Sequence, residues 1–263
     1  MPELPKKAVI LARGLGTRMR AETAGVELTA EQQRVADAGI KALIPLADGK
    51  TLLELILENI RAAGFSDVCL VIGPENDRIR EFCSEKALDI EFATQIQPKG
   101  TADAVLAAKK CVGRSKLFLV VNSDNLYPVE SLRKLRESAC PAMLAFEREA
   151  LIANSNIGSE RIAKFATVEI DNNGLLRSVV EKPETVAADS FVSMNAWLFS
   201  LEIFEACSSI EPSQRGEYEI TTAVQYAIDT LGVAFKAVKT SEGVLDLSSR
   251  SDIASVSRSI SEK

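Results

Sequence analysis

The first apolar run of the chain leads into a glycine-rich loop, in the sequence Ala8-Val-Ile-Leu-Ala-Arg-Gly-Leu-Gly-Thr-Arg-Met19. The opening residues are apolar without alternation, which is typical of a strand buried on both faces of a parallel sheet. Gly14 and Gly16 allow torsions that a Cβ would forbid, so successive N–H groups can form an anion-binding concavity. Thr17 adds a hydroxyl and Arg18 a permanent positive charge. The stretch predicts a strand that leads into a polyphosphate loop, with a simple tight turn as the alternative.

Two better-known glycine loops do not fit this stretch. A P-loop would need Gly-Lys-Ser/Thr, but Gly16 is followed by Thr-Arg. A dinucleotide-binding turn would need a third glycine, and Met19 stands at that place. The loop is therefore not of either of these two types.

Composition sets the class of protein. The chain has 263 residues, of which 46% are hydrophobic, and this is enough for a full core in one continuous α/β unit. A net charge of −6 argues against a nucleic-acid partner, since such proteins usually carry a basic surface. No apolar run has the length of a membrane span and no signal-peptide pattern occurs at the start, so we expect a cytoplasmic location and no membrane partner.

Histidine is absent, and this excludes whole mechanisms. No histidine base, Ser-His-Asp triad or histidine-ligated zinc is available. The 5 cysteines are scattered, without a Cys-x-x-Cys spacing, so we expect them to be reduced and structural. Any metal must be bound by carboxylates, which favours Mg²⁺.

The region after the loop is expected to cover it. Residues 19–40 are polar, and Thr29 with Gln32 has capping-box spacing, which predicts a mobile lid with a short helix that ends near Gly39. Residues 41–46 are expected to be extended, with Lys41 at their start. Thr51 and Glu54 form a second capping box, ahead of apolar residues at helical spacing.

From this point strands and helices alternate. The pattern predicts strands over 67–73, 90–95, 117–121 and 142–147, and helices over 76–86, 102–110 and 130–140. Such alternation implies right-handed βαβ units, so we expect a doubly wound, mostly parallel sheet flanked by helices. Asp124 then falls just past the fourth strand, at the edge where open α/β sheets bind ligands.

The second half has a different pattern. Residues 164–170 and 175–180 are separated by Asp171-Asn-Asn-Gly174, a strong hairpin signal. We expect an antiparallel region laid against the first sheet, with a long strand over 190–199, further helices over 217–230 and 251–260, and a strand over 233–238. One domain over residues 1–263 would then have a half at 1–147 and a half at 148–263.

Several isolated residues are candidates for chemistry, and each has an alternative. Residues 95–101 form a second glycine turn that opens a helix, which is either a ligand loop or ordinary capping. Asp124 and Asp246 are either metal ligands or turn residues. Glu181 with Lys182 is either functional or a solvated surface pair, and Asn195 is either functional or a core amide.

Together these segments resemble the sugar-phosphate nucleotidylyltransferases, also called nucleoside-diphosphate-sugar pyrophosphorylases. The resemblance covers nearly the whole chain and rests on eight segments in the family's order. They are Leu11-Ala-Arg-Gly-Leu-Gly-Thr-Arg-Met19, Lys41-Ala-Leu-Ile-Pro45, Gly100-Thr-Ala-Asp-Ala104, Asp124-Asn125, Glu181-Lys-Pro183, Asn195, Arg215-Gly-Glu-Tyr-Glu219 and Asp246. The resemblance implies a Rossmann-like sheet of the GT-A type with an antiparallel sugar-binding subregion.

The resemblance also implies roles for these residues. Nucleotide binding would fall to Leu11, Ala12, Gly14, Gly16, Thr17, Gln95, Gly100 and Thr101, with Gln95 at the base edge. Arg18 would bind the departing pyrophosphate, Lys41 would bridge the reacting phosphates, and Asp124 with Asp246 would bind Mg²⁺. Sugar-1-phosphate contacts would come from Glu181, Lys182, Asn195 and Glu217.

The implied reaction is attack of a sugar-1-phosphate on the α-phosphorus of a nucleoside triphosphate, with release of pyrophosphate. Three departures from the family pattern leave the substrate open: Arg13 in place of a small residue, Ser123 before the metal aspartate, and Ala166 in place of a glycine. A regulatory paralogue without turnover is therefore the main alternative, and a cytidylyltransferase for a non-sugar alcohol phosphate is another. The sequence leaves open the base, the sugar and whether the chain forms a homo-oligomer.

Overall fold

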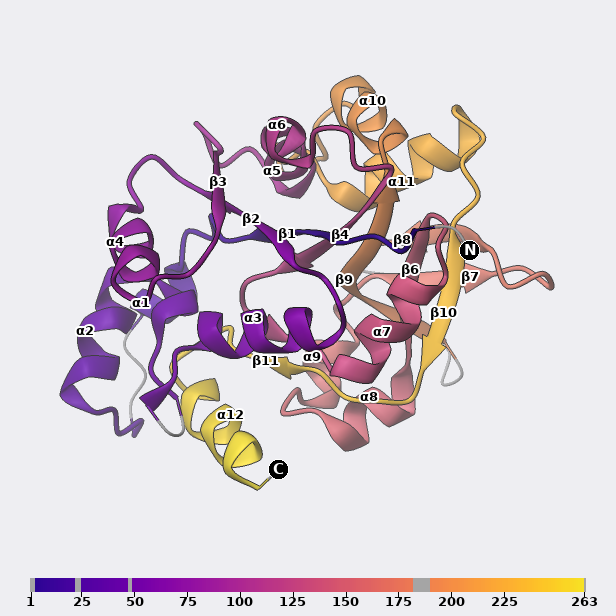
Figure 1. Ribbon diagram of the computed structural model, residues 1–263. Coiled ribbons are helices and arrows are strands. Elements are labelled where there is room, and N and C mark those ends of the chain that lie inside the picture. The colour runs from indigo at the N-terminus through magenta and orange to yellow at the C-terminus, as the bar shows by residue number, and fades with distance from the viewer. Residues whose placement is uncertain (1–2, 22–24, 47–48, 182–189, 263) are drawn as a thin grey trace.

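The computed structural model describes residues 3–21, 25–46, 49–181 and 190–262, in which one large sheet lies between layers of helices (Figure 1). This 9-stranded sheet has the order β10-β6-β9-β4-β1-β2-β3. In addition, β7 pairs with the first residues of β9 and β8 pairs with β7, while β11 pairs with β5 in a separate sheet. The strands are β1 Lys7–Leu11, β2 Asp67–Ile72, β3 Glu91–Thr94, β4 Leu117–Asn122, β5 Asn125–Leu126, β6 Ala142–Glu147, β7 Thr167–Ile170, β8 Leu176–Val180, β9 Phe191–Ser200, β10 Lys236–Thr240 and β11 Leu245–Asp246.

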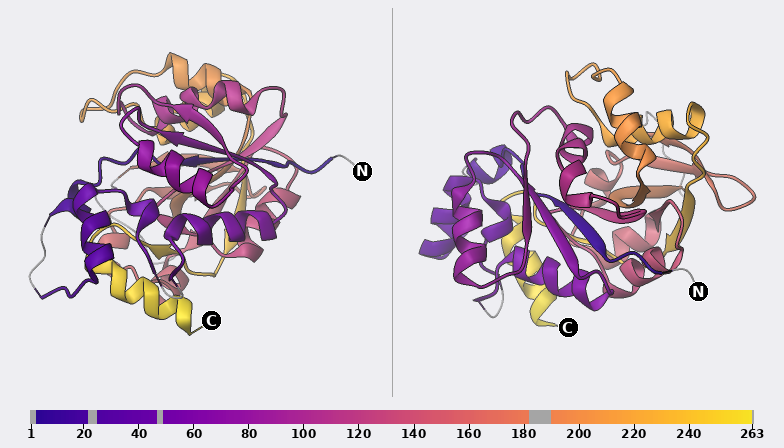
Figure 2. Two further views of the ribbon diagram at one scale, coloured as in Figure 1. Left: turned by 60° about the vertical axis from the view of Figure 1, so that its left-hand side comes forward. Right: turned by 45° about the horizontal axis from the view of Figure 1, so that its top comes forward.

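The helices cover both faces of the sheet (Figures 1 and 2). They are α1 Thr17–Arg20, α2 Ala30–Ala38, the 3-10 helix η1 Lys41–Leu43, α3 Leu52–Ala62, α4 Asp77–Glu85, α5 Thr101–Ala107, α6 Lys109–Val112, α7 Val129–Glu137, α8 Arg148–Asn154, α9 Ser159–Ile162, α10 Glu202–Ser209, α11 Ile220–Asp229 and α12 Asp252–Ser261. Side chains of α3 and α7 belong to one buried cluster, and those of α5, α10 and α11 belong to the other.

The predicted parallel arrangement is confirmed around β1. This strand pairs in parallel with β2 on one side and with β4 on the other, and β3 extends the parallel part beyond β2. Ala8, Val9 and Ile10 are all fully buried, as the unbroken apolar run predicted. The carboxyl ends of these strands therefore meet at one edge of the sheet.

The position predicted for the second half was wrong. Strand β9 does not lie against the first sheet but inside it, antiparallel between β4 and β6. Its side chains explain this position, because Val192 and Leu198 enter one buried cluster while Trp197 and Phe199 enter the other. A strand with two apolar faces is most stable where helices cover both of them. Both halves of the chain thus contribute strands to one sheet.

Several local predictions are confirmed. Thr29 with Gln32 and Thr51 with Glu54 form complete capping boxes at the starts of α2 and α3. The β7–β8 hairpin closes over residues 171–174, where the Asp171 carboxylate accepts hydrogen bonds from the N–H groups of residues 173 and 175. These elements depend on neighbours in the sequence, which is why short patterns predict them.

Other local predictions need correction. Residues 17–20 form α1 instead of continuing the loop, and residues 41–43 form a 3-10 helix where an extended segment was expected. The helix predicted over 102–110 is interrupted at Ala108, between α5 and α6. Among the described residues, no helix combines the length and apolar character that crossing a membrane would need.

Candidate active site

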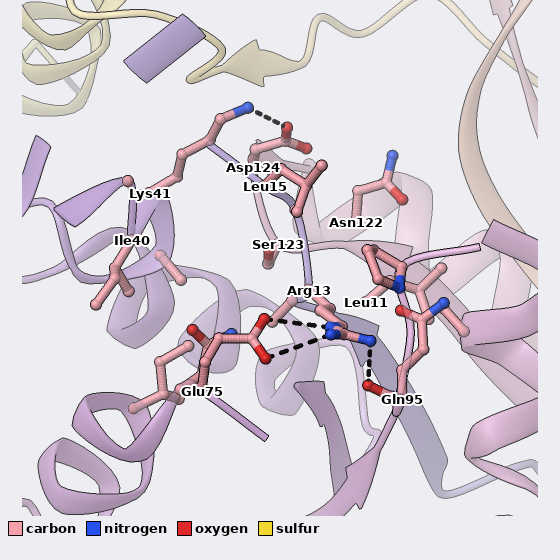
Figure 3. Close-up of a pocket in the computed structure, with 18 of the residues that line it drawn as sticks. Leu11, Arg13, Leu15, Ile40, Lys41, Glu75, Gln95, Asn122, Ser123 and Asp124 are labelled. Atoms are coloured by element: carbon pink, nitrogen blue, oxygen red, sulfur yellow. Dashed lines mark hydrogen bonds and ion pairs between the residues drawn. The ribbon is translucent and has the colours of Figure 1, made fainter. Parts of the chain in front are cut away.

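A cavity of about 430 Å³ lies at the carboxyl edge of the parallel strands (Figure 3). Its walls come from the loops that follow β1, β2, β3 and β4, from residues 38–42 at the end of the lid and the start of η1, and from Glu217. This is the edge where open α/β sheets bind ligands, as predicted. Nine of the predicted site residues line it: Leu11, Ala12, Gly14, Lys41, Gln95, Gly100, Thr101, Asp124 and Glu217.

The glycine-rich loop supports the lid directly. Gly16 has a φ of 62° and caps α1, and a Cβ there would lie 2.2 Å from the carbonyl oxygen of Gly39. Gly39 has a φ of 73° and ends α2. Arg18 is exposed on α1, and neither it nor Thr17 lines the cavity, whereas Arg20 does. The first loop and the lid therefore contact each other with no room for a side chain between them.

A buried arginine from the C-terminal segment holds the lid in place. The Arg250 guanidinium donates to the carbonyl oxygens of Met19 at 2.8 Å and Arg20 at 3.1 Å, and it lies 2.6 Å from the Asp37 carboxylate. This places α12 beside the lid helices (Figure 2). The predicted mobility of the lid stays a prediction.

Lys41 and Asp124 form an ion pair in the cavity wall. The distance from Lys41 Nζ to Asp124 Oδ2 is 3.0 Å, and the two side chains are 18% and 28% exposed. The amino group comes from η1, directly after the lid, and the carboxylate from the turn that follows β4, so the ion pair connects η1 to the sheet edge (Figure 3). A positive charge and a carboxylate thus face the cavity together.

Asp246 lies beside Asp124 but outside the cavity lining. Strands β5 and β11 place it opposite Asn125, whose amide donates to Asp246 Oδ2 at 2.9 Å, and the N–H of Leu247 donates to the Asp124 carbonyl at 2.8 Å. Burial, and then the charge of Asp124, raises the pKa of Asp246. Two neighbouring carboxylates are a fitting donor set for Mg²⁺, since this ion commonly takes one or two carboxylates and completes its shell with substrate phosphates. Within the described ranges no third acidic, cysteine or histidine ligand joins them.

Arg161 is a residue that the sequence reasoning missed. Its guanidinium forms ion pairs with the carboxylates of Asp246 and, at 2.8 Å, Asp252. The residue lies in α9, within a polar segment that carries no recognisable motif, so no local signal could have revealed this role. Each of the two predicted metal ligands is thus paired with a cationic side chain.

Arg13 crosses the cavity between two loops. Its guanidinium lies 3.3 Å from both carboxylate oxygens of Glu75 and also donates to the carbonyl oxygen of Gln95 (Figure 3). A hydrogen bond from the backbone N–H of Glu75, and then the Arg13 guanidinium, lowers the pKa of the Glu75 carboxyl. The departure from the small residue expected at position 13 therefore connects the loops that follow β1, β2 and β3.

The Gln95 side chain is fixed on the far wall. It is buried, and its Nε2 donates to the Gly100 carbonyl at 3.1 Å and to Asp103 Oδ2 at 2.7 Å. Thr101 supports the same turn, because its hydroxyl accepts a hydrogen bond from the N–H of Ile220 at 2.9 Å. The second glycine turn is thus held from both halves of the chain.

The residues predicted to contact the sugar phosphate are more dispersed. Asn195 has a φ of 57° within β9, and its Oδ1 accepts a hydrogen bond from the Trp197 indole at 3.3 Å. Glu181 accepts one from the Thr221 hydroxyl at 3.1 Å. Glu217 lines the cavity 3.8 Å from Arg215, and Lys182 lies outside the described residues.

Comparison with known sequences decides the family. The sequence profile described as nucleotidyl transferase matches residues 7–263. The chain belongs to this family. All of the site residues above lie inside the matched region, so the cavity is a feature of the family's domain in this chain.

Two similar proteins act on glucose-1-phosphate according to their names. A glucose-1-phosphate thymidylyltransferase of Streptomyces griseus is 31% identical over 228 residues, which cover 85% of this chain and 57% of the relative. A UTP–glucose-1-phosphate uridylyltransferase of Haloferax volcanii is 25% identical, with 84% of this chain and 83% of that protein covered. The chain thus spans little more than half the length of the Streptomyces protein.

Solved structures show the same fold. A UDP-glucose pyrophosphorylase complexed with UDP-glucose superimposes with a TM-score of 0.74 at 19% identity, covering 98% of this chain and 99% of the other. An inositol-1-phosphate CTP transferase from T. maritima gives 0.74 at 16% identity, covering 100% and 97%. At these identities the likeness concerns the fold alone. The predicted mostly parallel, Rossmann-like sheet is confirmed as nucleotidyltransferase architecture.

Proposed function

We propose that this chain transfers a nucleotidyl group from a nucleoside triphosphate to a sugar-1-phosphate. The observation that carries this proposal is the Lys41–Asp124 ion pair, which faces the same cavity as the glycine-rich loop. The names of the relatives support a hexose-1-phosphate as the acceptor. The products are a nucleotide sugar and pyrophosphate.

The reaction needs positioning and charge neutralisation more than proton transfer. An oxygen of the sugar-1-phosphate attacks the α-phosphorus, the bond to the bridging oxygen breaks, and pyrophosphate leaves. The attacking phosphate is already anionic near neutral pH, so no general base is required, in keeping with a chain that has 0 histidines. Lys41 brings the two polyanions together and stabilises the negative charge that grows between them.

The nucleotide is assigned to the cavity between the two glycine turns. Gly14 lines this cavity, whereas Gly16, Thr17 and Arg18 lie outside its lining at the start of α1. Assigning Gly16 and Thr17 to the triphosphate and Arg18 to the departing pyrophosphate therefore requires the phosphate chain to extend from the cavity to the start of α1. The base lies against the second turn. In this proposal its contacts come from Leu11 and Ala12 on one side and from Gln95, Gly100 and Thr101 on the other.

Magnesium is assigned to Asp124 and Asp246. When bound, the ion supplies positive charge that neutralises the phosphates during transfer. Asp124 and Asp246 would hold the ion in place of their present pairing with Lys41 and Arg161, and Lys41 would then be available to the substrate phosphates. Glu181, Lys182, Asn195 and Glu217 are assigned to the sugar-1-phosphate.

The test is pyrophosphate release across a grid of five nucleoside triphosphates and the 1-phosphates of glucose, galactose, mannose and N-acetylglucosamine, with Mg²⁺ and with EDTA. We expect one nucleotide and one sugar phosphate to dominate, and EDTA to abolish release. If the protein binds nucleotide but releases no pyrophosphate with any of these substrate combinations, the regulatory alternative is favoured. Turnover only of CTP with a non-sugar alcohol phosphate would favour the cytidylyltransferase alternative.

A further inference from the structure

Arg20 differs from the other cationic residues that line the cavity. The Arg13 guanidinium is paired with the Glu75 carboxylate at 3.3 Å (Figure 3). Lys41 is paired with Asp124 at 3.0 Å. Arg20 also lines the cavity, but its guanidinium forms no ion pair with any acidic side chain of the described residues. Its positive charge is therefore available to a ligand.

Glu217, a further acid of the lining, does not neutralise Arg20 either. It lies 3.8 Å from the guanidinium of Arg215. Each carboxylate of the described lining thus has a cationic partner of its own. An unpaired cation in a concave site attracts anions and raises their local concentration. In a chain with a net charge of −6, such a cation marks the part of the cavity that is most favourable to a polyanion.

The Arg20 guanidinium is held against the backbone at the end of the lid. Its Nη2 donates to the Ala38 carbonyl at 3.0 Å, and a Cβ on Gly39 would lie 2.7 Å from its Nε. Both Ala38 and Gly39 line the cavity. None of the other N–H groups of this guanidinium donates to a described residue. The side chain is thus oriented by one hydrogen bond and keeps donors for a ligand.

The α1 backbone decides that Arg20, and not Arg18, lines the cavity. Side chains two positions apart on a helix point to different sides, and Arg18 lies outside the lining. The carbonyl oxygens of Met19 and Arg20 accept hydrogen bonds from the buried Arg250 guanidinium at 2.8 and 3.1 Å. Rotating α1 to exchange the two arginines would break these bonds.

We propose that Arg20 is a phosphate-binding residue that contacts the triphosphate of the substrate inside the cavity. A guanidinium can bind two oxygens of one phosphate or connect neighbouring phosphates. Arg20 can do so without losing an ion pair, whereas Arg13 and Lys41 would each have to leave a carboxylate. The inference rests on the proposed function, because it takes the cavity to be the triphosphate site.

The experiment measures the affinity for inorganic pyrophosphate by calorimetry in Mg²⁺ buffer without nucleotide or sugar phosphate, so that turnover cannot interfere. We expect Arg20→Gln to weaken binding by about tenfold or more, the loss of a charged hydrogen-bonded contact. Arg20→Lys keeps the charge without the planar fork and should weaken binding by about threefold. Equal affinities of the wild type and Arg20→Gln would overturn the inference.

Two further arginine variants make the test specific. Arg34→Gln is the matched control, since Arg34 is an exposed arginine of α2, paired with Glu31 and outside the cavity lining. It should keep the wild-type affinity for pyrophosphate. Arg18→Gln should weaken binding less than Arg20→Gln does, and the reverse order would overturn the inference.

Support of the lid alone would give a different result. In that case Arg20→Gln and Arg20→Lys would lose pyrophosphate affinity equally, whatever their charge, and this would overturn the inference. Arg20 is exposed, so both variants should keep the fold, which circular dichroism checks.

The substrate grid separates this inference from the proposed function. Turnover in the grid with unchanged pyrophosphate affinity in Arg20→Gln would overturn the inference and leave the function intact. Weakened binding in Arg20→Gln, with no turnover by the wild type, would support the inference and contradict the proposed activity. Absence of pyrophosphate binding by the wild type would overturn the inference whatever the grid shows.

Discussion

Lys41 Nζ lies 3.0 Å from Asp124 Oδ2, so the cation assigned to the substrate phosphates is paired with the carboxylate assigned to the metal. The two groups come from sequence positions 83 residues apart, Lys41 from η1 and Asp124 from the turn after β4, and only the fold brings them together. A metal ion at Asp124 and a lysine on the same oxygen compete with each other. We therefore expect binding of Mg²⁺ to release Lys41 toward the phosphates.

Replacing Asp124 tests this competition. Asp124→Ala is expected to lower Mg²⁺-dependent pyrophosphate release by about 100-fold or more, because the variant lacks a ligand for the metal ion that neutralises the negative charge of the transition state. The fold should persist, since loss of a partly exposed ion pair costs about 1 kcal/mol or less. Activity assays with circular dichroism check both points. Pyrophosphate release at the wild-type rate in this variant would show that Asp124 is a turn residue and not a metal ligand.

Lys41→Gln separates the lysine from the metal. We expect turnover to fall by about 100-fold through loss of positive charge at the reacting phosphates. Binding of Mn²⁺, measured by electron paramagnetic resonance, should be as tight as in the wild type or tighter, because a competing cation has been removed. Lys6→Gln, which removes an exposed lysine paired with Glu3, is the control and should change neither quantity. Full activity of Lys41→Gln would contradict the assignment.

Arg161→Gln should destabilise the protein through Asp246. The variant leaves a carboxylate that is 5% exposed without its cationic partner, and we expect the free energy of unfolding to fall by about 2 kcal/mol. Urea unfolding measures this, and added Mg²⁺ should recover part of the loss by taking the place of the cation. Arg133→Gln removes an exposed i,i+3 pair and should cost less than about 0.5 kcal/mol. Equal losses in the two variants would refute the buried role.

Replacing Gly16 by alanine should destabilise the protein much more than replacing Gly14, the other glycine of the first loop. Gly16→Ala places a methyl group 2.2 Å from the Gly39 carbonyl at a φ of 62°, so we expect a loss of about 2 kcal/mol or more. At Gly14 the position that a Cβ would take has no other atom within 4 Å, and Gly14→Ala should change stability by less than about 0.5 kcal/mol. Thermal unfolding of both variants checks the contrast. Similar midpoints would show that the lid does not rest on Gly16.

Thiol labelling tests the structural role of the cysteines. Burial raises the pKa of Cys83 to about 11 and that of Cys207 to about 12, so near pH 8 these thiols stay protonated and unreactive. Cys69 is buried as well, whereas Cys111 and Cys140 are partly exposed. Brief alkylation with iodoacetamide and mass spectrometry should therefore modify Cys111 and Cys140 first. Rapid modification of Cys207 would show that α10 opens.

Local sequence patterns predicted much of the fold. The apolar run before Gly14, the capping boxes at Thr29 and Thr51, and the turn over 171–174 each depend on residues a few positions apart. Such patterns report hydrogen bonds and burial that form within one element. They failed for β9, because an apolar strand gives no signal of which neighbours it will pair with.

The sequence by itself determined a histidine-free α/β protein with a glycine-rich loop at the end of a buried strand, since composition and short-range spacing are properties of the chain alone. Only the tertiary structure decided that Arg13 reaches Glu75, that Arg161 reaches Asp246, and that β9 lies inside the sheet. The partners in these contacts are distant in the chain, and chain folding brings them together. Contacts of that kind leave no periodic trace in a single sequence.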